Sequence, residues 1–222
     1  MKNHLPAARL AISAAIFILV AYAWLDMFVF AGEGALSSRG IAGFKYFTVD
    51  SNLFAGFAAL ADVFFELSVI RKKRTSPPAW FETVYYAAAV SVSLTFVVVI
   101  SFLVFIFGFL PMFSGPNGIF HFVVPVLTAC SLCVTRRERK IRFRETFLAL
   151  IPLLMYAVYY IGCMFAFGID PTGVRSDWYH FSIGGAGTVP FVLLFVLLVA
   201  WGIALLLRFG CGGAKGKGSA AD

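Results

Sequence analysis

Side chains capable of hydrolytic chemistry gather in two short stretches of this sequence. The first stretch holds Thr48, Asp50, Ser51 and Asn52, and the second holds His121. A hydroxyl becomes an effective nucleophile when a base within about 3 Å takes its proton, and neutral histidine is the usual base. These residue types therefore predict an ester-cleaving site with Thr48 as the nucleophile and His121 as the base.

The remaining polar residues have supporting roles in this hypothesis. Asp26 or Asp50 would orient the imidazole and stabilise its charged form. Ser51 is the second choice of hydroxyl, and Asn52 would donate a hydrogen bond to a developing oxyanion. The same set of residues would also suit the headgroup of a lipid that is bound without being cleaved.

The composition indicates the environment in which these residues lie. Of the 222 residues, 61% are hydrophobic and only 13% are charged, and the mean hydropathy is +0.90. Such a chain is too apolar to be a soluble domain. A nucleic-acid-binding module, a Rossmann enzyme and a disulfide-stapled secreted domain are therefore excluded, and no nucleic-acid partner is expected.

Long apolar runs predict an all-α membrane protein with six transmembrane helices in residues 1–209. A bilayer core about 30 Å thick needs roughly 20 helical residues for each crossing. The predicted spans are residues 10–32, 47–70, 84–110, 119–135, 147–169 and 188–207. The Gly- and Lys-rich tail, residues 210–222, is expected to be disordered.

The distribution of basic residues predicts the orientation. Of the 18 Lys and Arg residues, all but Arg39, Lys45 and Arg175 fall on the side of the two termini. The positive-inside rule therefore places both termini in the cytoplasm. The membrane would be the cytoplasmic one in a bacterium, or the endoplasmic reticulum or plasma membrane in a eukaryote.

This topology places the candidate residues at one depth in the membrane. Thr48 and His121 begin spans that run inward, and Asp26 lies roughly 9 Å below the outer end of the first span. The third, fifth and sixth predicted spans contain no Asp, Glu, Lys, Arg or His. Because ionisable groups inside a bilayer are costly, this shared layer is the best candidate for a functional site.

The other polar and reactive residues have simpler explanations. Asp62 and Glu66 are expected to face the basic loop at Arg71, and Trp178 and Tyr179 to anchor the chain at the membrane interface. The four cysteines, Cys130, Cys133, Cys163 and Cys211, do not have zinc-site spacing and are expected to pack as small apolar residues. No metal or organic cofactor is expected.

Two motifs fall at equivalent places in the topology, at the starts of the second and fourth spans. The first is an aromatic-Lys-Tyr-x-Thr-x-x-x-Asn pattern in Gly43-Phe44-Lys45-Tyr46-Phe47-Thr48-Val49-Asp50-Ser51-Asn52-Leu53. The second is a His-x-x-x-Pro pattern in Asn117-Gly118-Ile119-Phe120-His121-Phe122-Val123-Val124-Pro125-Val126-Leu127. On these motifs the chain resembles the androgen-induced protein family of six-pass membrane proteins.

The resemblance implies a threonine hydrolase that acts on fatty acid esters of hydroxy fatty acids. Thr48 matches the nucleophilic threonine and His121 the catalytic histidine of that family. The chain departs from the family at Asp50, where a more apolar residue is expected, and in Phe167-Gly168-Ile169-Asp170-Pro171, where an aromatic-Pro-aromatic sequence is expected.

Two other functions fit the same residues. An acyltransferase would use the same Thr/His pair but hand the acyl group to another lipid in place of water. A non-catalytic lipid-binding or transport protein would use the layer of Asp26, Asp50 and His121 to hold a polar headgroup or pass protons. In every case the expected partners are lipids, and the sequence is silent on oligomeric state.

Overall fold

The computed structural model describes residues 5–30, 40–135, 140–170, 172–173 and 175–211, and within these ranges every regular element is helical. Six helical segments there are long and apolar enough to cross a membrane: Leu5–Val29, Phe47–Ile70, Ala79–Phe107, Gly115–Cys133, Phe143–Phe167 and Ala186–Gly210. The predicted all-α architecture with six transmembrane helices is thereby confirmed. Apart from Gly210 and Cys211, the tail expected to be disordered lies outside the described residues.

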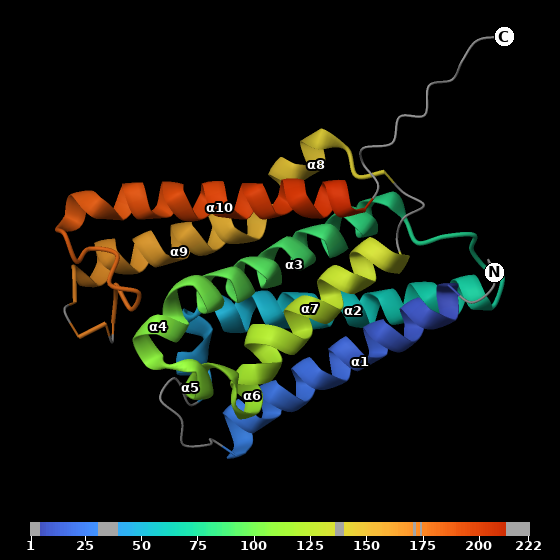
Figure 1. Cartoon of the computed structure of the whole chain (residues 1–222), viewed down its shortest axis with the longest axis horizontal. Helices are drawn as coiled ribbons and strands as arrows, with labels where there is room; N and C mark the ends of the chain where they lie inside the picture. Colours follow the sequence, from blue (N-terminus) through green and yellow to red (C-terminus); the bar gives the residue numbers. More distant parts are fainter. Residues whose placement is uncertain (1–4, 31–39, 136–139, 171, 174, 212–222) are drawn as a thin grey trace, which may run out of the picture.

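The six segments lie side by side along the longest axis of the molecule (Figure 1). Helix α1 (Leu5–Leu25) begins, and helix α10 (Val189–Gly210) ends, at the same end of the bundle, here called the terminal end. The opposite end, which holds the start of α2 (Phe47–Ile70), is called the site end. The positive-inside prediction assigns the terminal end to the cytoplasm.

Helices α1 and α2 form the most extensive pairing in the bundle. Small residues on α2 allow the close approach, because a Cβ atom added to Gly56 would lie only 2.7 Å from Cγ1 of Val20. Close packing over small residues is how helices associate in lipid, where hydrophobic burial between helices gives little gain. This pairing fixes the position of α2, the helix that carries Thr48.

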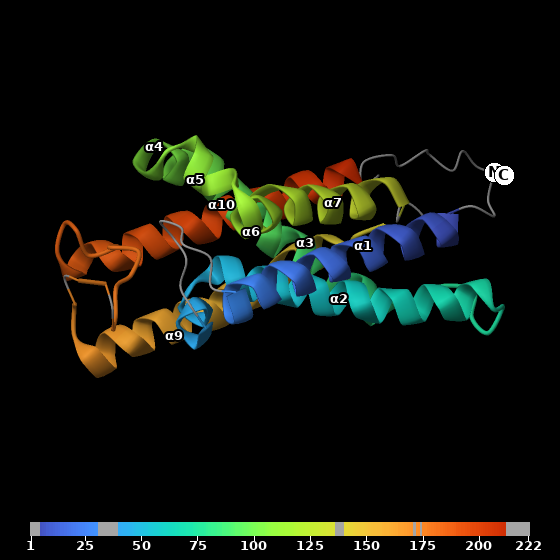
Figure 2. The same cartoon turned by 90° about the horizontal axis from the view of Figure 1, so that it is seen from below.

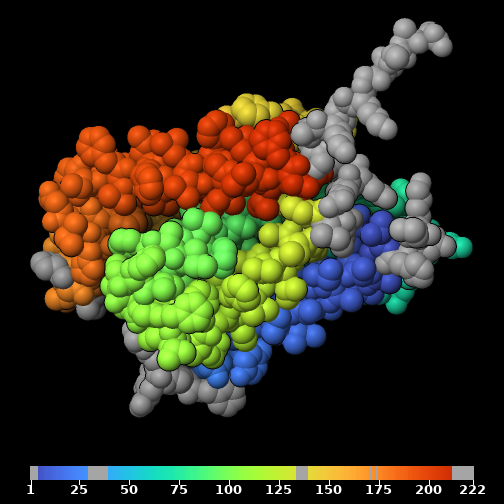
Figure 3. Space-filling view, viewed as in Figure 1, coloured from blue at the N-terminus to red at the C-terminus, as the bar shows by residue number. Residues whose placement is uncertain are grey.

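Helix α3 (Ala79–Val98) occupies the centre of the bundle and packs against α2, α7 (Val124–Cys130) and α10. Its middle is fully covered, with every residue from 85 to 92 buried. The space-filling view accordingly shows little of its darker green surface between α10 and α7 (Figure 3). Helix α3 therefore supports α2, which carries Thr48, and the fourth span, which carries His121.

The third span continues beyond α3 into a short apolar hairpin. It passes through a π-helical turn, η4 (Val99–Leu103), and α4 (Val104–Phe107), and reverses at Gly108, whose φ of 85° suits glycine. Two further short helices, α5 (Phe109–Phe113) and α6 (Gly115–Gly118), lead into the fourth span. Figure 2 shows α4 and α5 projecting from the bundle, where their apolar side chains would meet lipid.

The fourth span is a continuous but irregular helix, and the fifth is divided into two helices. The fourth consists of two π-helical segments, η5 (Ile119–Val123) and η6 (Ser131–Thr135), on either side of α7. The fifth was predicted as one helix, but it divides into α8 (Phe143–Leu148) and α9 (Ile151–Phe167). Proline favours the first turn of a helix, so Pro152 marks the start of α9.

Candidate functional site

The first turn of α2 is held in place by the loop between α9 and α10. The Phe47 amide N–H, one of the free donors at the helix start, donates to the Tyr179 hydroxyl at 2.9 Å. The Tyr156 hydroxyl donates to the Lys45 carbonyl at 2.5 Å and accepts from Nε1 of Trp178 at 2.9 Å. Tyr179 of the loop and Tyr156 of α9 together fix the start of the helix turn that carries Thr48.

Trp178 is not the exposed interface anchor that the sequence predicts, whereas Tyr179 is half-buried. Trp178 is buried, with 8% of its surface exposed, and both rings pack against Tyr160 of α9. Burial raises the pKa of Tyr179 to about 12, so its hydroxyl stays protonated at neutral pH. Both side chains take part in the contacts that hold the start of α2: Tyr179 accepts from the Phe47 amide, and Trp178 donates to Tyr156.

Asp177 holds this loop together from within. Its buried carboxylate accepts hydrogen bonds from the Tyr160 and Ser182 hydroxyls and from the amide N–H groups of Phe181, at 2.8 Å, and Ser182, at 3.2 Å. Burial alone would raise its pKa, but these hydrogen bonds to the charged form outweigh it and lower the pKa below its usual value of 3.8. The ionised form is therefore the one that stabilises the loop.

We expect Asp177→Asn to destabilise the protein by about 1–3 kcal/mol at neutral pH, through loss of charge-assisted hydrogen bonds. A lowered carboxyl pKa stabilises the folded protein above the unfolded value and loses that contribution as pH falls through the folded value. The thermal unfolding midpoints of wild type and variant should therefore differ at pH 7 and converge below the usual pKa of 3.8. Asparagine tolerates the positive φ of 51° at this position, so backbone strain does not confound the comparison. A constant difference from pH 7 to pH 3 would contradict this role of Asp177.

Thr48 lies in the first turn of α2 with its side chain half-buried. Its hydroxyl and its amide N–H have no hydrogen-bond partner among the residues that the structure describes. Its carbonyl accepts from the amide nitrogen of Asn52 at 2.7 Å and from the Ser51 hydroxyl at 3.2 Å. The backbone of Thr48 is thus fixed while its hydroxyl is available for chemistry.

His121 lies in the π-helical segment η5 and is buried, with 4% of its surface exposed. Its Nδ1 is 2.7 Å from the Met112 carbonyl oxygen. Since a carbonyl can only accept, Nδ1 carries the proton and Nε2 of the neutral ring keeps its lone pair. This is the tautomer that a general base requires.

Asn52 joins the two candidate catalytic segments. Its side-chain nitrogen donates to the Thr48 carbonyl at 2.7 Å and to the Phe120 carbonyl at 3.1 Å. One amide group therefore ties the turn that carries Thr48 to the residue next to His121. Because both N–H groups are engaged, Asn52 supports the site by joining its parts and not by the expected donation to an oxyanion.

The segment that carries His121 is also shaped by Gly118. A Cβ atom at this position would lie 2.3 Å from the Phe113 carbonyl oxygen, so only glycine fits without a backbone shift. The tight approach brings residues 112–113 against η5, where the Met112 carbonyl meets the imidazole. The sequence did not indicate the role of Met112, because its contact with His121 is made by a backbone carbonyl, which every residue type has.

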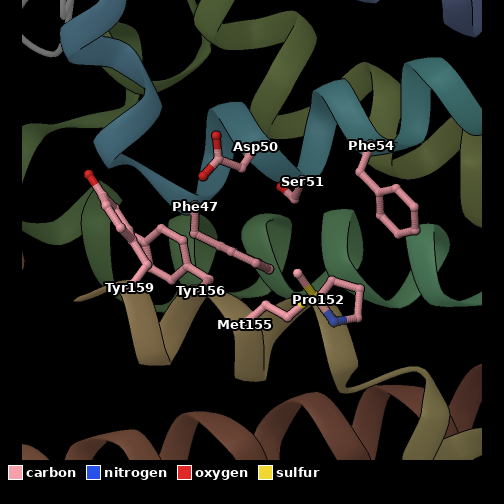
Figure 4. A pocket seen from close by; sticks show the side chains of 8 residues that line it. All are labelled: Phe47, Asp50, Ser51, Phe54, Pro152, Met155, Tyr156 and Tyr159. Atoms are coloured by element: carbon pink, nitrogen blue, oxygen red, sulfur yellow. The ribbon is translucent and has the colours of Figure 1, made fainter. Parts of the chain in front are cut away.

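The other supporting residues point in different directions. Ser51 is buried against α3, where its hydroxyl lies 3.1 Å from that of Thr95. Asp26 begins the π-helical segment η2 (Asp26–Phe30), and Asp50 lines a groove between α2 and α9 (Figure 4). Neither aspartate hydrogen-bonds to His121 in the described part of the chain. The Met112 carbonyl takes the orienting role expected of a carboxylate.

The prediction that Asp62 and Glu66 face the basic loop is wrong. Both are completely buried and face α1. The Ser13 hydroxyl donates to Oδ2 of Asp62 at 2.7 Å, and Nη1 of Arg9 lies 3.5 Å from Oε1 of Glu66. A carboxylate that is buried between membrane helices needs a polar or charged partner. For Glu66 this partner is Arg9, which the charge distribution had assigned to the membrane surface.

The cysteines add one contact that the sequence did not indicate. Sγ of Cys133 lies 3.2 Å from Sγ of Cys211, near the terminal end, and all four cysteines are free thiols. No group of three or more potential metal ligands occurs among the described residues.

Comparison with models of known protein families, with curated proteins and with solved structures finds no match. The functional argument therefore rests on the residues and geometry of this chain.

Proposed function

We propose that this protein is an intramembrane lipid-ester hydrolase with Thr48 as nucleophile and His121 as general base. The observation that carries the proposal is the bridge by Asn52, which ties the backbone beside each residue to the same amide group. A free hydroxyl on one side and a histidine tautomer with a basic Nε2 on the other are the two parts that nucleophilic ester cleavage needs.

The reaction follows from these roles. Nε2 of His121 takes the hydroxyl proton while Oγ1 of Thr48 bonds to the ester carbonyl carbon. As the tetrahedral intermediate collapses, the imidazolium returns the proton to the leaving alkoxide, and the acyl group remains on Thr48. His121 then deprotonates a water molecule as it attacks the acyl carbon. When this second intermediate collapses, the imidazolium returns the proton to Oγ1 of Thr48 and the fatty acid leaves.

The amide N–H of Thr48 is suited to stabilise the oxyanion. It is one of the free donors at the start of α2, where the helix dipole also favours negative charge. The nucleophile's own amide lies beside the carbonyl under attack, and such donors contribute strongly to acyl transfer. This group replaces Asn52 as the donor to the oxyanion in the mechanism.

The position of the site within the apolar bundle supports a lipid ester as the substrate. An acyl chain lying in the bilayer would bring its ester group to the first turn of α2. Fatty acid esters meet this requirement, and the resemblance to the androgen-induced protein family implies fatty acid esters of hydroxy fatty acids in particular. Neither a metal nor an organic cofactor takes part in the proposed reaction.

The test is hydrolysis of a panel of lipid esters by the purified protein in detergent. The panel includes a fatty acid ester of a hydroxy fatty acid, a monoacylglycerol and a cholesteryl ester. Release of free fatty acid in proportion to enzyme supports the proposal, and no turnover of any ester overturns it. Added alcohol or lysolipid distinguishes an acyltransferase, because the acyl group would then appear on the added acceptor.

A transport or proton-transfer function is the second candidate, and the buried Asp62 and Glu66 favour it. Buried carboxylates between two membrane helices are typical of ion and proton pathways. We expect this function to produce pH-dependent flux into proteoliposomes that Asp62→Asn abolishes, with no ester cleavage. Hydrolysis without flux would reject it.

A further inference from the structure

We propose that the groove between α2 and α9 at the site end binds a single-chain lipid or other amphiphile with an alkylammonium headgroup. The groove has a volume of about 300 Å³ and is lined by Phe47, Asp50, Ser51, Phe54, Pro152, Met155, Tyr156 and Tyr159. It faces α9, whereas the Thr48 and His121 segments are joined on the side of η5. The groove therefore lies next to the helix turn that carries Thr48, but on the side that faces α9.

Asp50 gives the groove its charge. Its side chain is half-buried in the first turn of α2, and it has neither a hydrogen-bond donor nor a cation as partner within the described ranges. The nearest basic residue in sequence, Lys45, is engaged elsewhere: its Nζ donates to the Gly173 carbonyl at 3.3 Å and lies 5.1 Å from the centre of the Tyr46 ring. A carboxylate without a partner near a membrane boundary attracts a cation.

Aromatic rings surround the same end of the groove. Figure 4 shows Phe47 next to Asp50 on α2 and the rings of Tyr156 and Tyr159 on the α9 side of the groove. The Tyr156 ring centre lies 5.2 Å from that of Phe47 and 6.1 Å from that of Tyr159. The hydrogen bonds of the Tyr156 hydroxyl to Lys45 and Trp178 hold this ring in place. A groove lined by aromatic rings and one carboxylate has the two kinds of group that recognise quaternary ammonium ions.

The other end of the groove suits an alkyl chain. Phe54 lies one turn deeper along α2 than Asp50, and Met155 and Pro152 lie deeper along α9 than Tyr159. A bound molecule would therefore place its headgroup at the site end and its chain toward the membrane centre. Met155 and Tyr159 are 69% and 47% exposed, so the groove opens sideways to lipid.

The polar groups of the groove do not suit a metal ion or an anionic lipid. A hard metal ion needs several oxygen ligands, but Asp50 supplies the one carboxylate, and the Ser51 hydroxyl already bonds to Thr95. An anionic lipid would be repelled by Asp50. A volume of about 300 Å³ holds a trimethylammonium group and the first methylene groups, with the rest of the chain in the bilayer.

The experiment uses hexadecyltrimethylammonium with a photoactivatable diazirine in its chain, added to the full-length protein in maltoside micelles. We expect crosslinks to the α2 peptide that contains Phe54 and to the α9 peptide that contains Met155. Unlabelled hexadecyltrimethylammonium should compete, whereas hexadecanol and hexadecyl sulfate should not. Equal competition by hexadecanol would overturn the proposal, because it would show that the headgroup charge is not recognised.

The matched variants are Asp50→Asn and Asp26→Asn, which remove one carboxylate each near the site end. Asp50→Asn should lower specific labelling about ten-fold through loss of the charge, and Tyr159→Leu several-fold through loss of a cation–π contact. Asp26→Asn should label like wild type. Undiminished labelling of a folded Asp50→Asn protein would also overturn the proposal. Thr48→Ala should keep full labelling, so failure of the hydrolase proposal would leave this one standing.

Discussion

Replacement of Thr48 by valine should abolish ester turnover while leaving the protein folded. Valine keeps the shape and β-branching of threonine but has no hydroxyl to attack the ester. Removal of the nucleophile from an enzyme of this type costs about 10³-fold or more in kcat. The measurement is fatty acid release by wild type and Thr48→Val under identical conditions, on whichever ester of the panel is cleaved fastest.

The structure supplies the controls for this result. The Thr48 hydroxyl makes no hydrogen bond to any described residue, so its removal should change the unfolding midpoint little. Thr48→Ser keeps a hydroxyl and should retain measurable turnover, whereas Ser51→Ala removes the neighbouring hydroxyl and should retain most of it. Wild-type turnover by Thr48→Val, or loss of turnover only in Ser51→Ala, would move the nucleophile away from Thr48.

Replacement of His121 by asparagine should have the second largest effect. Asparagine retains an N–H group that can reach the Met112 carbonyl, which accepts from Nδ1 at 2.7 Å in wild type. It has no basic nitrogen in place of Nε2. We expect a loss of about 10²–10⁴-fold in kcat, the usual contribution of a positioned general base.

Two further measurements separate a catalytic role of His121 from a structural one. Substrate binding, followed through KM, should change much less than kcat, because the imidazole acts on the hydroxyl and not on the acyl chain. The unfolding midpoint of His121→Asn should stay near that of wild type if the Met112 contact is retained. Unaltered kcat in a folded His121→Asn protein would exclude this histidine as the base.

The bundle was largely predictable from the sequence, because membrane spans are set by apolar length alone. The second span was predicted and observed at Phe47–Ile70, since an extended Tyr46 precedes it and a basic turn follows it. The fifth span was predicted as one helix, although Pro152 marks where it divides. The cytoplasmic orientation of the termini stays a prediction from the charge distribution.

The site was predictable only in part. Depth along the spans selected Thr48, Asn52 and His121, and the structure places their segments side by side. Depth does not specify which neighbour a residue faces, so Asp50 was grouped with His121 although it lines the groove between α2 and α9.

Contacts between side chains and distant backbone could not be predicted. The Met112 carbonyl that fixes the histidine tautomer and the Tyr179 hydroxyl that holds the start of α2 both depend on the path of a loop. Residue type does not record such a path. The same reason explains why Arg9 was not recognised as the partner of Glu66.

The most direct test of the central claim is mass spectrometry of the protein after reaction with a fluorophosphonate probe that labels activated hydroxyls. Trypsin cleavage after Lys45 and Arg71 gives one peptide, residues 46–71, that contains Thr48, Ser51 and Ser68. Fragment ions should place the adduct on Thr48, and His121→Asn should prevent its formation. An adduct on either serine, or no adduct on a protein that cleaves esters, would contradict the account.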